Sequence, residues 1–190
     1  MSTAPVHFSS LTPAKCRVLF LIVLVLCLAR SGSTCPENCL CYRTQAGPTV
    51  RCNHHSLSRI PSVPSSTVVL DLRFNNISII EDGDLAELRH LTTLFLSGNN
   101  IHTIEAEAFS GLSSLKYLYL FNNKLRWIHE NAFSGLNFLE QLYLYLNEIE
   151  YIPVDAFSDL TALERLYLHH NRLKSLPRGL FKNLHALRRL

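Results

Sequence analysis

The sequence lacks the short motifs by which many enzymes are recognised. It has no G-x-S-x-G, no H-E-x-x-H, no phosphate-binding loop and no constellation of paired carboxylates, which argues against the enzyme classes that depend on them. Two adjacent histidine pairs, His54-His55 and His169-His170, do not predict a metal site, because neighbouring strand residues point to opposite faces. We therefore assign no catalytic residue, cofactor or metal to this chain and expect it not to be an enzyme.

A long hydrophobic run is also missing. The apolar stretch from Val18 to Ala29 has 12 residues, whereas a membrane-spanning helix needs roughly 20. Lys15 and Arg17 precede this stretch and small residues follow it, so residues 1–33 are predicted to be a cleaved secretory signal peptide. We expect no membrane span after cleavage, with a signal anchor as the alternative.

Acidic residues are absent from both ends of the chain. The first 33 residues contain none, and without them the chain has 15 basic and 15 acidic residues, so no net charge favours nucleic acid as a partner. No acid follows Glu164, whereas seven basic residues do: Arg165, Arg172, Lys174, Arg178, Lys182, Arg188 and Arg189. Such an end can attract an acidic glycosaminoglycan or an acidic protein face. The alternative is an ordinary solvated end.

What the sequence does have is a period of 24 residues. Leucine recurs at Leu91, Leu115, Leu139, Leu163 and Leu187, and asparagine recurs at Asn75, Asn99, Asn123, Asn147 and Asn171. The pattern L-x-x-L-x-L-x-x-N-x-L is typical of leucine-rich repeats, whose turns cannot bury their apolar residues alone and must stack. We predict an α/β leucine-rich repeat solenoid, which is a curved right-handed coil with a parallel sheet on its concave face.

The period also predicts the domain organisation. Residues 34–66 are expected to form a cysteine-rich amino-terminal cap, residues 67–186 five full repeats, and residues 187–190 the start of a sixth. Because Leu187 and Leu190 would face water if nothing followed them, we expect the chain to be a fragment of a longer protein.

Four cysteines lie within or just after the cap's first segment: Cys35, Cys39, Cys41 and Cys52. An even number in an oxidising compartment favours disulfides over a zinc site, which needs reduced ligands. A bridge from Cys39 to Cys41 would strain disulfide geometry. Two pairings remain, namely Cys35–Cys41 with Cys39–Cys52, or Cys35–Cys39 with Cys41–Cys52.

Within each repeat, alternation predicts a short strand with its leucines facing inward. The asparagine that ends the strand, for example Asn147, is expected to bond backbone groups of its own and the next turn, because an unpaired buried amide costs about 1–3 kcal/mol. The phenylalanines at the 24-residue spacing, Phe109, Phe133, Phe157 and Phe181, are predicted to stack in the core.

The outward strand positions carry the functional information. Aromatic residues gather there: Phe95, Tyr117, Tyr119, Phe121, Tyr143, Tyr145 and Tyr167, with His169 beside them. Together with Arg165 they form our predicted protein-binding site, since tyrosine is enriched at binding hot spots and exposed apolar patches mark interfaces. The alternative is that aromatic residues merely fill the sheet. Arg165 and Arg189 could bind an acidic group of the partner.

The sequence has one N-glycosylation sequon, Asn76-Ile77-Ser78, and Asn76 is expected to be exposed and modified.

The strand segments resemble those of a known family. Val69-Leu70-Asp71-Leu72-Arg73-Phe74-Asn75, Leu139-Glu140-Gln141-Leu142-Tyr143-Leu144 and the cysteine segment from Cys35 to Cys41 are similar to the leucine-rich region of peroxidasins. Slit, Nogo-receptor and LINGO-type ectodomains are the competing relatives. The resemblance implies the pairing Cys35–Cys41 with Cys39–Cys52. The segment from Tyr42 to Arg51 departs from the family and looks like an insertion.

The resemblance also implies a function. In peroxidasins the repeats are followed by immunoglobulin domains and a haem peroxidase domain that crosslinks matrix collagen, but no position here corresponds to the haem-contacting residues. We expect a secreted, extracellular-matrix module that binds a protein on its concave face. The alternatives are that the full-length product is a matrix haem peroxidase, or that the chain is the ectodomain of a cell-surface receptor or adhesion protein.

Overall fold

The computed structural model describes residues 34–190, and the predicted signal peptide at 1–33 lies outside the described residues. The described part consists of short strands joined by turns: β1 (Leu40–Thr44), β2 (Gly47–Arg51), β3 (Val69–Asp71), β4 (Ile79–Ile80), β5 (Thr93–Phe95), β6 (Thr103–Ile104), β7 (Tyr117–Tyr119), β8 (Gln141–Tyr143) and β9 (Arg165–Tyr167).

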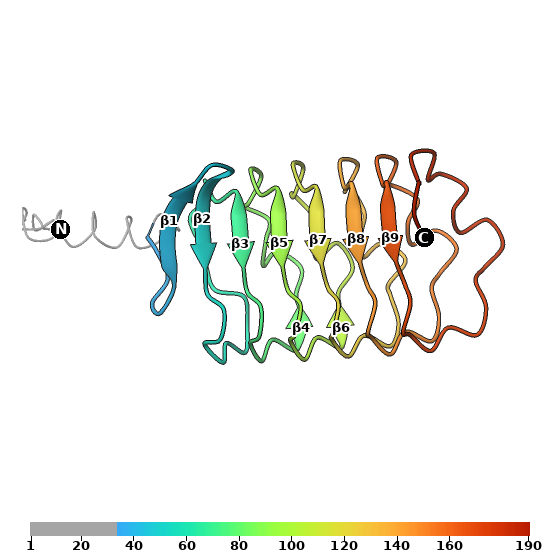
Figure 1. Ribbon diagram of the computed structural model, residues 1–190, viewed down its shortest axis with the longest axis horizontal. Helices are drawn as coiled ribbons and strands as arrows, with labels where there is room; N and C mark the ends of the chain where they lie inside the picture. The colour runs from blue at the N-terminus through green and yellow to red at the C-terminus, as the bar shows by residue number, and fades with distance from the viewer. Residues whose placement is uncertain (1–33) are drawn as a thin grey trace, which may run out of the picture. The chain divides into compact units, whose positions relative to one another are not determined.

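One seven-stranded sheet forms a wall of the coil, in the order β1-β2-β3-β5-β7-β8-β9 (Figure 1). The strands from β2 onward are parallel, and from β3 onward each residue pairs with the residue 24 positions further on, as Leu94 does with Leu118. A second, two-stranded sheet of β4 and β6 lies elsewhere on the coil. The leucine-rich repeat solenoid is thus confirmed, although turns rather than α-helices connect the strands within residues 34–190.

The core follows the repeat. The inward leucines of successive strands, Leu70, Leu94, Leu118, Leu142 and Leu166, are fully buried. Behind them the rings of Phe109 and Phe133 stack with centroids 5.8 Å apart, and Phe133 meets Phe157 at 6.0 Å. Phe181 continues the row but is only partly buried. The predicted phenylalanine row is therefore confirmed for its buried members.

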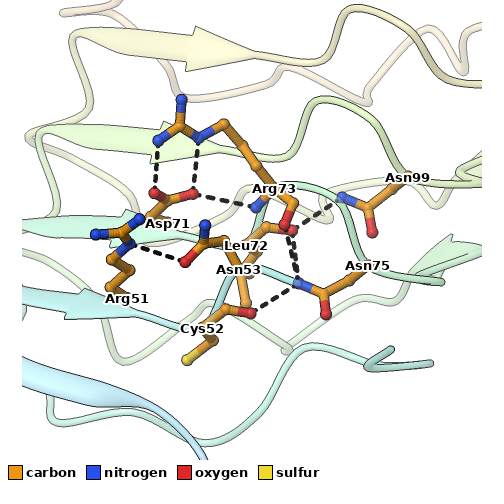
Figure 2. A network of polar contacts seen from close by, with 8 residues as sticks. All are labelled: Arg51, Cys52, Asn53, Asp71, Leu72, Arg73, Asn75 and Asn99. Carbon is orange, nitrogen blue, oxygen red and sulfur yellow. Dashed lines mark hydrogen bonds and ion pairs between the residues drawn. The ribbon is translucent and has the colours of Figure 1, made fainter. Parts of the chain in front are cut away.

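The asparagines form the predicted ladder. The amide nitrogen of Asn123 donates to the carbonyl oxygens of Leu96 and Leu120, at 3.0 Å each, and its oxygen accepts from the backbone N–H of Ile101 at 3.0 Å. The same set of bonds recurs one turn later at Asn147. Figure 2 shows the first step, where Asn75 donates to Cys52 and Leu72. Each asparagine therefore ties two turns together.

The residue before each ladder asparagine has a left-handed backbone. Gly98 has φ 71°, and a Cβ atom there would lie 2.5 Å from the ring of Phe74, so a larger residue would displace this ring. Phe74 and Leu146 adopt the same conformation, with φ of 55° and 54°. Bulky side chains rarely take this conformation, so the repeat geometry outweighs the local preference at these positions.

The cap contains both disulfides, Cys35–Cys41 and Cys39–Cys52. This is one of the two pairings that the spacing left open and the one that the resemblance implied. The segment from Tyr42 to Arg51, which departs from the family pattern, mostly belongs to an antiparallel hairpin of β1 with β2, and β2 pairs with β3. The cap therefore extends the sheet and supplies backbone partners for the first repeat. That this segment is an insertion relative to the family stays a prediction.

At the other end of the described residues, Leu187 packs partly against the core and Leu190 is 64% exposed. The isolated bridge between Arg165 and Arg189 extends the sheet wall by one further pairing. Among residues 34–190, no helix has the length and apolar character needed to span a bilayer.

The sheet face as a candidate interaction site

The outward side chains of the sheet form three columns, which together we call the sheet face. Column 1 contains Thr93, Tyr117, Gln141, Arg165 and Arg189. Column 2 contains Asp71, Phe95, Tyr119, Tyr143 and Tyr167. Column 3 contains Arg73, Ser97, Phe121, Tyr145 and His169. Because the leucines between them point inward, the repeat itself places these residues side by side.

The aromatic rings stack along the columns. In column 2 the centroids of Phe95 and Tyr119, of Tyr119 and Tyr143, and of Tyr143 and Tyr167 lie 4.7, 4.6 and 4.9 Å apart. In column 3 Phe121 stacks on Tyr145 at 4.6 Å, and Tyr145 on His169 at 4.7 Å. Stacking leaves the phenylalanine and tyrosine rings half-buried, whereas His169 at the end of column 3 is exposed. The surface therefore presents the edges of aromatic rings that are already ordered by stacking. A partner would not need to fix their side-chain rotamers on binding.

The amino-terminal end of column 2 is closed by an ion pair (Figure 2). The guanidinium of Arg73 donates to both carboxylate oxygens of Asp71, at 2.9 and 2.7 Å, and this hydrogen-bonded contact raises the pKa of Arg73. The same guanidinium lies 4.8 Å from the centroid of the Phe95 ring. Asp71 is 6% exposed despite its outward position on the strand. The negative charge of Asp71 is therefore neutralised by Arg73.

In column 1 the phenol of Tyr117 is held in place by Glu140. Tyr117 donates from its hydroxyl to one carboxylate oxygen at 3.1 Å, and Lys116 donates to the other at 2.8 Å. The bond from Lys116 lowers the pKa of Glu140, with partial burial acting in the opposite sense. In column 2 the hydroxyl of Tyr143 donates to Gln141 at 2.6 Å. Both hydroxyls therefore have a defined orientation.

The phenols of Tyr117, Tyr119 and Tyr145 should ionise at a higher pH than a free tyrosine. Burial raises the pKa of Tyr119 and of Tyr145, and burial followed by the bond to Glu140 raises that of Tyr117. A folded-state pKa above the unfolded value of about 10 means stability that is complete below that pH and is lost as the pH rises through the folded pKa. Spectrophotometric titration of phenolate should give a higher midpoint for folded than for urea-unfolded protein. Coincident curves would contradict the packing of these rings.

The basic residues after Glu164 do not act as one patch. Three of them pair with acids, as Arg172 does with Glu148 at 3.0 Å, Lys182 with Asp155 at 3.0 Å and Arg188 with Glu164 at 3.6 Å. Arg165 and Arg189 lie in column 1, whereas Lys174 and Arg178 follow in the turns beyond β9. The charge of this end is thus divided between separate surfaces.

Sequence reasoning missed a second exposed aromatic group. Trp127 and Tyr151 are 50% and 59% exposed and form a parallel bridge at the repeat position of β4 and β6, away from the sheet face. Their shared place in the repeat, directly before the inward Ile128 and Ile152, is the signal that could have revealed them. They are a rival surface and a useful control.

The sequon asparagine is exposed as expected. The oxygen of Asn76 accepts a hydrogen bond from the amide of Asn100, its neighbour one turn on. A glycan is attached through the nitrogen of Asn76, so this bond does not compete with attachment. Glycosylation stays a prediction. Within residues 34–190, no group of histidine, cysteine and carboxylate side chains is arranged to hold a metal ion.

One strand per turn, an asparagine ladder at the strand ends and a face of variable side chains together define a solenoid repeat protein. The family model described as "Leucine rich repeat" matches residues 64–101, 89–149 and 139–190. The chain belongs to the leucine-rich repeat family.

Among its relatives, the repeat region is similar to that of peroxidasins, as the strand residues indicated. It is 45% identical to the peroxidasin homolog of Mus musculus over 86 residues, which is 40% of this chain and 6% of that protein. It is 46% identical to the peroxidasin homolog of Homo sapiens over 74 residues, which is 39% of this chain and 5% of that protein. Decorin from Bos taurus is 38% identical over 66 residues, 34% of this chain and 17% of that protein.

A solved structure gives the same fold. The crystal structure of a TLR13–ssRNA13 complex superimposes with a TM-score of 0.70 at 29% identity, covering 79% of this chain and 22% of that chain. The matched regions are thus a small part of the peroxidasins, and what those proteins do as a whole is not carried over with the repeats.

Proposed function

We propose that this chain is a protein-interaction module that binds a partner protein through its sheet face. The observation that carries the proposal is the pair of stacked aromatic columns, which contain Phe95, Tyr119, Tyr143 and Tyr167 in one and Phe121 and Tyr145 in the other. Tyrosine is a frequent hot-spot residue, and rings that are ordered before binding lose little side-chain entropy in a complex.

We further propose that the module is secreted and acts in the extracellular matrix. Two disulfides within a short cap require an oxidising compartment. The similarity to peroxidasins supports the same location, since that resemblance implies a secreted matrix protein. No residue of this chain is assigned a catalytic role in the proposal.

Replacement of three tyrosines in column 2 is expected to abolish capture of the partner. The full chain would be expressed by secretion, immobilised and incubated with an extracellular-matrix extract, alongside the variant Tyr119→Ser/Tyr143→Ser/Tyr167→Ser. Proteins retained by the wild type should be lost, with affinity reduced by at least about a hundredfold, because truncation of hot-spot residues costs about 2 kcal/mol or more each.

The matched control is Trp127→Ser/Tyr151→Ser, which removes exposed aromatic rings away from the sheet face. It should capture the same proteins as the wild type. Thermal unfolding of all three proteins checks that the tyrosine variant is folded at the assay temperature, and the single variant Tyr143→Ser serves if it is not. If the control lost the partner while the tyrosine variants kept it, the binding surface would be the Trp127 side instead.

A further inference from the structure

The sheet face carries more positive than negative charge. Its basic side chains are Arg73, Arg165 and Arg189, together with Arg51, which pairs with Asp71 and so precedes it in column 2; its acid is Asp71. Arg73 and Asp71 neutralise each other through their two hydrogen bonds. The net charge of the face therefore comes from its two ends, with Arg51 at one and the pair Arg165 and Arg189 at the other.

Arg165 and Arg189 lie directly beside each other. They form a parallel bridge, and the backbone N–H of Leu166 donates to the carbonyl oxygen of Arg189 at 3.0 Å. Neighbouring strands of a sheet lie about 4.8 Å apart, so the two arginine side chains leave the sheet face from adjacent positions. Arg165 is half-buried and Arg189 is exposed.

No acid of the described residues compensates this pair. The ion pairs within residues 34–190 involve other side chains. Glu164, the acid directly before Arg165 in the sequence, pairs with Arg188. The neighbouring acceptors are also engaged, since Gln141 accepts from Tyr143 and Glu140 accepts from Tyr117 and Lys116. The two guanidinium groups therefore lack a counter-charge within this part of the chain.

The geometry favours a small anion over a long polyanion. A glycosaminoglycan would need cations spread along one surface, but Lys174 and Arg178 lie beyond the sheet and Arg172, Lys182 and Arg188 already pair with acids. Guanidinium groups match a carboxylate with two parallel hydrogen bonds. Tyr167, in the next column beside Arg165, adds a phenol at the same end.

We propose that Arg165 and Arg189 bind a carboxylate from an acidic segment of the partner protein that docks on the sheet face. The inference rests on the proposed function and adds the chemistry and orientation of the partner, whose acidic segment lies at the β9 end of the face. The interfacial contact is a charge-assisted hydrogen bond, and it should strengthen as ionic strength falls.

The test uses a fluorescein-labelled pentaglutamate peptide titrated with the full chain and followed by fluorescence anisotropy. The variant Arg165→Gln/Arg189→Gln should bind this peptide at least about tenfold more weakly than the wild type, which corresponds to about 1.4 kcal/mol. The matched control Lys174→Gln/Arg178→Gln loses the same charge off the sheet face and should bind within about twofold of the wild type. The arginine Nε–H signals of Arg165 and Arg189 in ¹H–¹⁵N NMR spectra should shift on peptide addition.

Several results would overturn the inference. They are an absence of peptide binding by the wild type, an equal loss in both double variants, or heparin binding to which both pairs contribute equally, which would indicate a polysaccharide site. Failure here is distinguishable from failure of the proposed function. If the captured partner is lost by the tyrosine variant but kept by Arg165→Gln/Arg189→Gln, the sheet face still binds and the carboxylate contact alone is refuted.

Discussion

Replacement of Phe133 by alanine is expected to lower the free energy of unfolding by about 3–5 kcal/mol, because the surrounding core does not close over the cavity that a buried ring leaves. Phe133 is 1% exposed and lies between the rings of Phe109 and Phe157. Its loss therefore removes contacts in three consecutive turns. Urea unfolding followed by the fluorescence of Trp127, the single tryptophan of the chain, measures this change within the same repeat.

The control for this prediction is Phe138→Ala, five residues further along. Phe138 is 63% exposed, so its truncation should change stability by less than about 0.5 kcal/mol, the usual range for surface positions. If the two variants had equal unfolding midpoints, the row of phenylalanines would not be part of the core, and the stacking of the turns would need another explanation.

Replacement of Asn123 by alanine is expected to cost roughly 2–4 kcal/mol. The N–H of Ile101 loses its partner, whereas the carbonyls of Leu96 and Leu120 each keep a second bond, from Asn99 and Asn147. The loss thus comes from one orphaned donor and two weakened acceptors. Chemical unfolding of the variant and the wild type in parallel measures this loss in the free energy of unfolding.

Asn123→Asp separates the contributions of donor and acceptor. It keeps an oxygen for Ile101 but turns a carboxylate toward two backbone carbonyls, so burial and repulsion should raise the pKa of the introduced carboxyl. Because a raised folded-state pKa gives stability below it that is lost above it, this variant should be more stable in acid than at neutral pH, relative to the wild type.

The control variant is Asn137→Ala. Asn137 is an exposed asparagine outside the ladder, so this variant should unfold like the wild type. A ladder variant as stable as that control would show that the amide bonds are dispensable.

The repeat could be predicted because each turn imposes the same physical requirement on the same positions. A leucine such as Leu118 must be apolar to stack on Leu94 and Leu142, and Asn123 must be an amide to satisfy both a donor and acceptors. These requirements are local in the repeat and appear in the sequence as a period. The columns of the sheet face follow from the same register, which is why their residues could be named before their geometry was known.

Features that depend on side chains meeting in space could not be predicted in this way. The period places Asp71 and Arg73 on the outward side of the strand, but it does not show that Arg73 folds back to pair with Asp71. The sequence left open whether the basic end attracts a polyanion or is an ordinary solvated end, and it did not show that acids one turn earlier, such as Glu148 and Asp155, neutralise part of it. The hairpin of β1 and β2 lies outside the period, so its strands left no repeated pattern to detect.

The most direct test of the account is oxidative footprinting of the chain with and without its captured partner, by hydroxyl radicals and mass spectrometry. The account predicts that Tyr119, Tyr143 and Tyr167 are protected in the complex, while Trp127 and Tyr151 oxidise at the same rate in both samples. Protection of Trp127 and Tyr151 with unchanged oxidation of the column tyrosines would contradict it.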